Sequence, residues 1–257
     1  MKIFSAVKPA LGAGIACLAF CCFFGGCARC AAFALAVGML MYAIAPHICP
    51  VLRHFCVAVA CGAAARVTCC GGAFVLGTAM PFVTGLALCD GLCALLRAKR
   101  GAAKSVLRAL ARAFAMAAGY ALAFPLQTAA APSPDILWSA AGAFGFALML
   151  GARPFSGALA ALACGAACLY TNIFVAVFAA YAACDLLGRP SLARIAVVPL
   201  VPGGGLLIAF TALLKGSFAL AAGMLLVSAH AFLSIAFARV CAHVLTAAVF
   251  RRAPRPQ

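Results

Sequence analysis

VVPLVPGGGL, residues 197–206, interrupts an otherwise continuous apolar stretch of this chain. Proline removes a backbone donor and fixes φ, and glycine weakens a helix interior. Two prolines and three consecutive glycines therefore predict a broken helix at this point. A weaker version of the same element, AMPFVTGLAL, occupies residues 79–88, so the chain places a helix-breaking element in apolar surroundings twice.

The composition is that of a membrane protein. Of 257 residues, 68% are hydrophobic and only 9% are charged, whereas soluble domains carry about 25% charged residues. Since a bilayer is crossed by about 20 apolar residues per helix, we predict an all-α, polytopic membrane protein with about ten transmembrane helices. The predicted spans lie near 9–27, 30–45, 52–66, 68–88, 106–125, 136–151, 155–170, 172–187, 194–213 and 217–239.

Lysine and arginine are distributed unevenly between the two ends of these spans. With a cytoplasmic N-terminus, sixteen of the nineteen basic residues fall on the cytoplasmic side, as the positive-inside rule requires. Both termini are therefore predicted to be cytoplasmic. The net charge of +16 does not indicate nucleic-acid binding, because the basic residues are spread along the chain and no nucleic-acid-binding motif accompanies them.

Sixteen cysteines raise the question of metal or redox chemistry. Cys27-Ala-Arg-Cys30 is a C-x-x-C sequence, but no second such pair and no nearby histidine completes a zinc set. Buried cysteine behaves as a small hydrophobic residue, and small residues let membrane helices approach closely. Packing is therefore the favoured interpretation, and no metal or cofactor is predicted.

The two breakers divide the chain into two similar halves, 1–130 and 131–257. Aligning Pro81 with Pro199 also aligns Gly85 with Gly203 and Leu88 with Leu206. Each half carries about five spans, with the breaker in the fourth. Because five is odd, the two halves are expected to enter the membrane in opposite orientations, as an inverted repeat of the kind that many secondary transporters use.

These residues resemble the threonine/serine exporter family of bacterial inner-membrane transporters. PLVPGGGL, which follows Gly188-Arg189-Pro190 and precedes Lys215-Gly216, is similar to the family's second five-span domain, over roughly residues 135–250. AFCCFFGG at 19–26 and GTAMPFVTGLALCD at 77–90 are similar to the membrane part of its first domain. There the chain departs from the pattern, with Thr84 in place of a usual proline and Asp90 as the only replacement for an expected acidic residue.

The resemblance implies a multi-pass protein of the bacterial inner membrane that exports small polar metabolites. Threonine and serine are the substrates for which the family is named, and some relatives are associated with export of dicarboxylates such as succinate. The energy would come from a proton gradient or the membrane potential, and no Walker-type phosphate-binding sequence indicates ATP. The soluble region that usually precedes the first domain is expected to be absent, since only eight residues come before the first span.

The paired breakers are the predicted substrate or ion site. Unwound backbone is tolerated at membrane depth where protein buries it or a wet cavity faces it, and half-helix ends can bind charged groups. The alternative is that the breakers only kink helices for packing. The residues of this predicted site are Pro81, Thr84, Gly85, Pro199, Pro202, Gly203, Gly204 and Gly205.

Three polar residues are further candidates for substrate or proton binding. Asp90, one of three acidic residues, is either a proton carrier at membrane depth or a loop charge beside Arg97. His230 in the last span is either a proton relay or a packing residue bonded to a nearby serine. Asn172 either lines a cavity or caps a helix, whereas His47, His54 and His243 are expected at the membrane interface.

Three classes of function remain open, led by a secondary exporter of threonine/serine-type amino acids. A dicarboxylate exporter and a non-transporting membrane subunit or scaffold are the alternatives. An intramembrane enzyme is not predicted, because Ser228 and His230 are two residues apart on one helix and point in different directions. The expected partners are a small polar metabolite, protons and the lipid bilayer, and a homo-oligomer stays open.

Overall fold

The computed structural model describes residues 2–44, 48–68, 70–82, 84–123 and 136–252. Within these ranges, side chains are described from residue 7 to residue 249. Helices make up nearly all of the described chain. Their bounds are α1 (Lys2–Phe23), α2 (Ala28–Ile44), α3 (Pro50–Val67), α4 (Gly72–Ala79), η2 (Met80–Phe82), α5 (Gly85–Leu96), α6 (Ala102–Ala123), α7 (Ile136–Met149), α8 (Pro154–Tyr170), α9 (Ile173–Leu186), α10 (Pro190–Ala196), η3 (Val198–Leu200), α11 (Gly203–Leu214) and α12 (Phe218–Arg252).

These helices lie where the spans are predicted, and several can cross a membrane. Within the described residues, α3, α6 and the Phe218–Val249 part of α12 are each long and apolar enough, and each of the two broken helices qualifies when its two parts are joined. The other apolar helices are shorter, between 14 and 17 residues over Val7–Phe23, α2, α7, α8 and α9. The all-helical, membrane-type fold is confirmed.

Both breakers are real interruptions of a helix. In each case an α-helix ends in a short 3-10 turn centred on a proline, Pro81 in η2 and Pro199 in η3. A new α-helix then starts at a glycine, Gly85 or Gly203. The two parts are bent by 46° in each pair. Proline ends the first segment because it has no N–H to donate to the preceding turn.

The two broken helices match in every boundary except the end of the first segment, Ala79 in α4 and Ala196 in α10. A displacement of 118 residues relates the first half to the second. It separates the starts of α4 and α10, of η2 and η3, and of α5 and α11, and also the residues that follow α5 and α11. The matched pairs are Gly72 and Pro190, Met80 and Val198, Gly85 and Gly203, and Arg97 and Lys215. The pairing of Pro81 with Pro199 in the sequence thus predicts the structural correspondence correctly.

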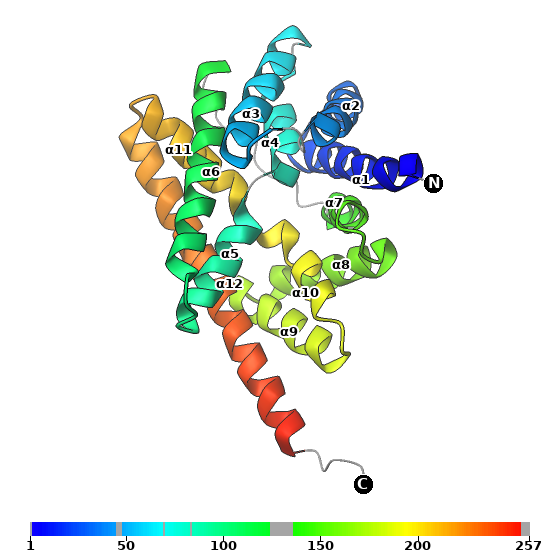
Figure 1. Cartoon of the computed structure of the whole chain (residues 1–257), viewed down its shortest axis with the longest axis vertical. Coiled ribbons are helices and arrows are strands. Elements are labelled where there is room, and N and C mark those ends of the chain that lie inside the picture. The colour runs from blue at the N-terminus through cyan, green and yellow to red at the C-terminus, as the bar shows by residue number, and fades with distance from the viewer. Residues whose placement is uncertain (1, 45–47, 69, 83, 124–135, 253–257) are drawn as a thin grey trace.

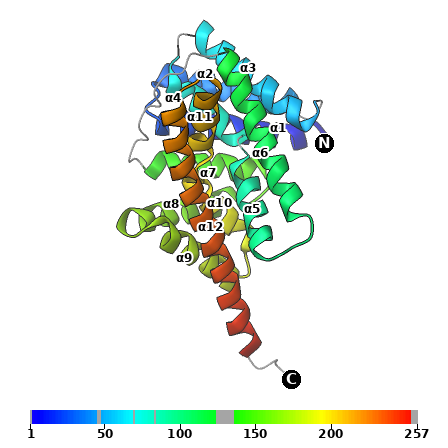
Figure 2. The ribbon, with the colours of Figure 1, turned by 90° about the vertical axis from the view of Figure 1, so that its left-hand side faces the viewer.

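Packing between helices follows the same correspondence. α3 packs on α6 as α9 packs on α12, and α5 packs on α6 as α11 packs on α12. Contacts between the halves are also paired, because α5 packs on α12 while α11 packs on α6. Figure 1 and Figure 2 show α1, α2 and α3 at one end of the molecule and α8, α9 and α10 at the other, with the long α12 running past them.

Glycine allows the closest approach between the halves, where α1 crosses α7. A Cβ atom on Gly145 would lie 2.5 Å from the backbone nitrogen of Ala16, and one on Gly12 would lie 2.6 Å from the carbonyl oxygen of Gly145. Side chains could not fit into either gap. The two helices therefore touch backbone to backbone, as small residues permit in membrane bundles.

The structure corrects two predicted spans. The last span is predicted at 217–239, but α12 continues to Arg252. The fourth span is predicted at 68–88, but its helix runs from Gly72 to Leu96 with the break near its middle. Asp90 therefore lies within α5, where two arginines accompany it (below), so its charge does not end the helix. The predicted boundary between the halves, 130/131, lies outside the described residues.

The crossing of α1 and α7 generates a stability prediction. Gly145→Ala should lower the free energy of unfolding by about 1–3 kcal/mol, because the added methyl group meets backbone atoms that cannot move aside. The measurement is the midpoint of thermal unfolding of the detergent-solubilised protein. Gly223→Ala in α12 is the matched control, since a Cβ atom there meets nothing within 4 Å. An equal midpoint in the two variants would contradict the packing at this crossing.

Candidate functional site

The two breakers meet each other in the middle of the fold. A Cβ atom on Gly85 would lie 2.5 Å from Cγ1 of Val201 and 3.4 Å from Cα of Gly203. Gly85 is the first residue of α5 and Gly203 is the first residue of α11. Two half-helices therefore converge with their N-termini close together, and a side chain at position 85 would collide with the Val201 side chain.

Converging helix N-termini create a positive electrostatic environment. The first N–H groups of a helix have no intrahelical partner, and the helix dipole adds partial positive charge at that end. At the start of α11, the Gly203 N–H donates to the carbonyl oxygen of Val201 at 2.8 Å, which ties the turn into the helix. Gly204 follows it and is also buried. The junction is thus suited to a carboxylate or another small anion.

Little space is open at the junction. The cavity there has a volume of about 20 Å³, which is close to the space that one water molecule needs. Its walls are mostly apolar. They are formed by Met80, Gly85, Leu86, Phe146, Val198, Val201 and Gly203.

Asp90 connects the first half of the chain to the second. Its two carboxylate oxygens accept hydrogen bonds from the guanidinium groups of Arg194 in α10 and Arg239 in α12. About a third of the Asp90 side chain is exposed. The Arg239 guanidinium carbon also lies 5.2 Å from the centre of the Tyr181 ring in α9, a cation–π distance. One carboxylate thus holds α5, α10 and α12 together.

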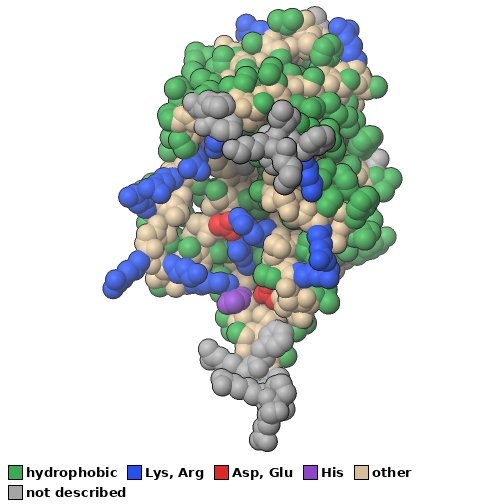
Figure 3. All heavy atoms as spheres, turned by 45° about the vertical axis from the view of Figure 1, so that its right-hand side comes forward, with side chains coloured by type: hydrophobic (Ala, Val, Ile, Leu, Met, Phe, Trp, Pro, Cys, Tyr) green, Lys and Arg blue, Asp and Glu red, His purple; other side chains and the backbone are tan. Residues whose placement is uncertain are grey.

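A pocket of about 170 Å³ surrounds this ion pair. Its lining contains four cationic side chains and one carboxylate, so the formal charge of the lining is +3, and two of the cations, Arg97 and Lys99, have no acidic partner in the pocket. Figure 3 shows basic side chains gathered around a hollow that holds an acidic group. The lining residues are Asp90, Cys93, Ala94, Arg97, Lys99, Arg194 and Arg239. We call this the basic pocket.

The basic pocket breaks the internal similarity of the fold. With the displacement of 118 residues between the broken helices, Asp90 corresponds to Ile208 and Arg194 to Leu76. Both counterparts are apolar, although Arg97 of the pocket corresponds to the basic Lys215. The ion pair around Asp90 is therefore not repeated in the second broken helix. By the distribution of basic residues in the sequence, the end of the molecule that holds the basic pocket is expected to face the cytoplasm.

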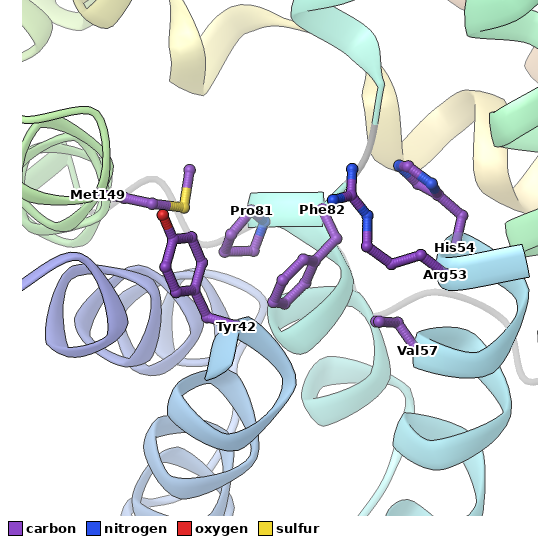
Figure 4. Close-up of a pocket in the computed structure, with 7 residues that line it drawn as sticks. All are labelled: Tyr42, Arg53, His54, Val57, Pro81, Phe82 and Met149. Atoms are coloured by element: carbon purple, nitrogen blue, oxygen red, sulfur yellow. The ribbon is translucent and has the colours of Figure 1, made fainter. Parts of the chain in front are cut away.

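A second cavity, of about 190 Å³, lies beside the first breaker. Figure 4 shows Pro81 and Phe82 between Tyr42 and Met149 on one side and Arg53 and His54 on the other. The His54 imidazole is hydrogen-bonded through Nδ1 to the carbonyl oxygen of Pro50. His54 is only 6% exposed, so its side chain is packed inside the protein, near the start of α3. The full lining is Tyr42, Arg53, His54, Val57, Pro81, Phe82 and Met149.

Of the eight predicted breaker residues, Gly85 and Gly203 meet at the junction, and most of the others hold the two breaks in place. The Thr84 hydroxyl donates to the carbonyl oxygen of Ala109 in α6 at 3.0 Å, so this side chain anchors the breaker. A Cβ atom on Gly205 would lie 2.6 Å from Oγ of Ser228, and one on Gly204 would lie 3.8 Å from Sδ of Met80. The three prolines of the predicted site take turn positions. Pro81 lies in η2, Pro199 lies in η3, and Pro202 immediately precedes α11.

Two predicted candidates lie elsewhere. The Asn172 side chain accepts a hydrogen bond from the Val175 N–H at 3.0 Å and caps α9, which is the capping alternative of the sequence interpretation. His230 is exposed on α12 and lines neither the junction nor the basic pocket. His243 lies 3.9 Å from Asp185, and His47 lies outside the described residues.

Sequence reasoning missed the two arginines that hold Asp90. Arg194 and Arg239 are counted there only as interfacial charges at the ends of spans. A signal was present, since a carboxylate inside an apolar helix requires a cationic partner. The sequence does not say which of sixteen cytoplasmic cations supplies it, because the partners are 104 and 149 residues away.

Comparisons with known proteins give no relative. No protein-family model, no curated protein and no solved structure matches this chain.

The ion pair around Asp90 generates a prediction. A double-mutant cycle of Asp90→Asn and Arg239→Gln should give a coupling energy of about 0.5–1 kcal/mol, the range for partly exposed pairs. The coupling is read from thermal unfolding in detergent at low salt. The Asp185→Asn and His243→Gln cycle is the control, because those atoms are 3.9 Å apart and His243 is largely exposed. Additive effects in the Asp90 cycle would contradict the link.

Proposed function

We propose that this protein is a secondary transporter that moves small metabolites bearing a carboxylate across the membrane. The observation that carries the proposal is the convergence of the α5 and α11 N-termini at Gly85 and Gly203. Paired discontinuous helices form the substrate site in many secondary transporters, and their N-termini point at anionic groups of the substrate. The repeated break therefore has a functional reason beyond packing.

Charge favours an anionic substrate over a neutral one. An amino acid such as threonine needs an acidic partner for its ammonium group, but Asp90 already accepts hydrogen bonds from two arginines. The lining of the basic pocket instead carries a net charge of +3, with Arg97 and Lys99 not bonded to Asp90. Among the substrates implied by the resemblance to threonine/serine exporters, a dicarboxylate is therefore placed ahead of threonine and serine.

The membrane potential supplies a direction for such a substrate. Moving one elementary charge across 100 mV is worth about 2.3 kcal/mol, and a dianion gains roughly twice that. An inside-negative potential drives anions outward, so export of a dicarboxylate needs no ATP. The basic pocket, at the expected cytoplasmic end, would collect the anion before it reaches the junction.

Alternating access supplies the mechanism. The cavity at the junction, about 20 Å³, is too small for a dicarboxylate, so the two breakers must separate for substrate to enter. Asp90 lies five residues past Gly85, about 7.5 Å along α5, and its bonds reach α10 and α12 of the other half. These bonds would form when the two halves close at this end and open when they part. We propose that the halves are an inverted repeat that moves in this way.

A membrane subunit without transport activity is the second candidate. Polar groups around the first breaker are used for packing within the protein. The Thr84 hydroxyl donates to the carbonyl oxygen of Ala109, and the Cys17 thiol donates to the carbonyl oxygen of Thr78 at 3.6 Å. A scaffold needs no more than this. Flux through the reconstituted protein separates the two candidates.

The transport prediction concerns protein reconstituted into liposomes loaded with radiolabelled succinate. A potential that is negative inside the vesicles should accelerate efflux, and Gly85→Val should reduce it at least about tenfold, because the new side chain fills the junction and blocks the closing motion. Gly223→Val, at an open position of α12, is the matched control for folding and insertion.

Two outcomes would contradict the proposal. Absence of flux for succinate, threonine and serine alike would favour the scaffold. Unchanged succinate efflux in Gly85→Val, with the variant inserted and folded, would remove the junction from the transport path.

A further inference from the structure

The Cys27-Ala-Arg-Cys30 sequence lies away from the junction, in the turn between α1 and α2. Cys27 immediately precedes α2, and Cys30 is within the first turn of that helix. The two sulfur atoms are 3.3 Å apart. Cys27 is exposed and Cys30 is half-buried. An accessible thiol and a protected thiol thus lie in contact at one helix start.

The position of Cys27 activates its sulfur. The Cys30 N–H and the Cys30 thiol, whose sulfur lies 3.3 Å away, stabilise the thiolate form of Cys27 and lower the pKa of Cys27 below its usual value, against a smaller opposing effect of burial. The geometry is that of an N-cap, in which a side chain accepts from the N–H three residues later. Thiolates at helix N-termini and in C-x-x-C motifs are the reactive form of cysteine.

Further thiols lie behind this pair. Cys70, between α3 and α4, is a neighbour of the Cys30 thiol and is 4% exposed. A Cβ atom on Gly26 would lie 2.4 Å from Sγ of Cys21, so the turn is packed against a further buried thiol. Among the described residues no group of three or more His, Cys, Asp or Glu side chains is placed to hold a metal ion. The arrangement therefore favours thiol–disulfide chemistry over metal binding.

We propose that Cys27 and Cys30 form a redox-active dithiol that exchanges with low-molecular-weight disulfides. The Cys27 thiolate attacks one sulfur of a disulfide R–S–S–R, forming a mixed disulfide and releasing one R–S⁻. Cys30 then gives up its proton and attacks the Cys27 sulfur, forming the Cys27–Cys30 disulfide and releasing the second R–S⁻. Two protein thiols are oxidised and one external disulfide is reduced to two R–SH.

The location fits this chemistry. By the predicted topology, the turn between α1 and α2 faces away from the cytoplasm, where oxidising compartments allow disulfides to form and persist. The exposed Cys27 meets the small disulfide, while Cys30 is held 3.3 Å behind it for the second attack. The proposal is independent of the transport function, because neither cysteine lines the junction or the basic pocket.

The test uses the full-length protein in detergent, first reduced and then equilibrated with mixtures of reduced and oxidised glutathione. Free thiols are alkylated, and the positions are read by peptide mass mapping. A Cys27–Cys30 disulfide should appear as the proportion of oxidised glutathione in the mixture rises. In Cys30→Ala, glutathione should stay attached to Cys27, since the resolving thiol is missing. In Cys27→Ala, Cys30 should take up little glutathione.

Cys49 is the matched control, because it is also exposed and also immediately precedes a helix, but its side chain makes no capping hydrogen bond. At pH 7, Cys27 should be alkylated several-fold faster than Cys49. The proposal is overturned if Cys27 and Cys30 stay reduced at the highest proportion of oxidised glutathione. It is also overturned if the Cys30→Ala variant, with an unchanged midpoint of thermal unfolding, traps no glutathione on Cys27.

Discussion

The backbone contact between the starts of α5 and α11 is the constraint on which the rest of the fold depends. A Cβ atom on Gly85 would touch Cα of Gly203 at 3.4 Å and collide with Cγ1 of Val201 at 2.5 Å, so the absence of a side chain at position 85 lets Val201 pack there. A helix that starts afresh in the middle of an apolar run requires an interruption before it, and Pro81 and Pro199 supply the interruption in both halves. The backbone crossing of α1 and α7 at Gly12 and Gly145 then lets the flanking helices close around the pair.

The contact between the starts of α5 and α11 also has an electrostatic consequence. Two helix N-termini that meet in apolar surroundings concentrate partial positive charge, and an anion between them would relieve it. The basic pocket adds full positive charges at one end of the same helix, α5. The positions that correspond to Asp90 and Arg194, Ile208 and Leu76, are apolar, whereas Lys215 corresponds to Arg97. The two broken helices thus match in their boundaries but differ in the carboxylate and in one of the arginines that bind it.

The sequence predicts the helices and the breaks well, and their contacts poorly. Hydropathy and proline–glycine chemistry are local properties, so the all-helical membrane fold and the equivalence of Pro81 with Pro199 follow from short stretches. The partners of Asp90 do not, because Arg194 and Arg239 approach it only after distant helices pack. The burial of His54 does not follow from the sequence for the same reason, since it depends on what packs against α3. The capping role of Asn172 was within reach, because it involves only Val175, three residues on.

Differences between the two halves indicate where the constraint acts. From the start of α4 to the end of α5, every boundary recurs 118 residues later in α10, η3 and α11, apart from the end of the first segment. α2 and α8 are displaced by 126 residues instead. The difference arises around the third helix of each half, where α3 has 18 residues and α9 has 14. The third helix therefore differs in length between the two halves, whereas the broken helix, 72–96 in one half and 190–214 in the other, has the same total length in both. A kink needed only for packing would tolerate the same drift, so the fixed length of the broken helix supports a site at its centre.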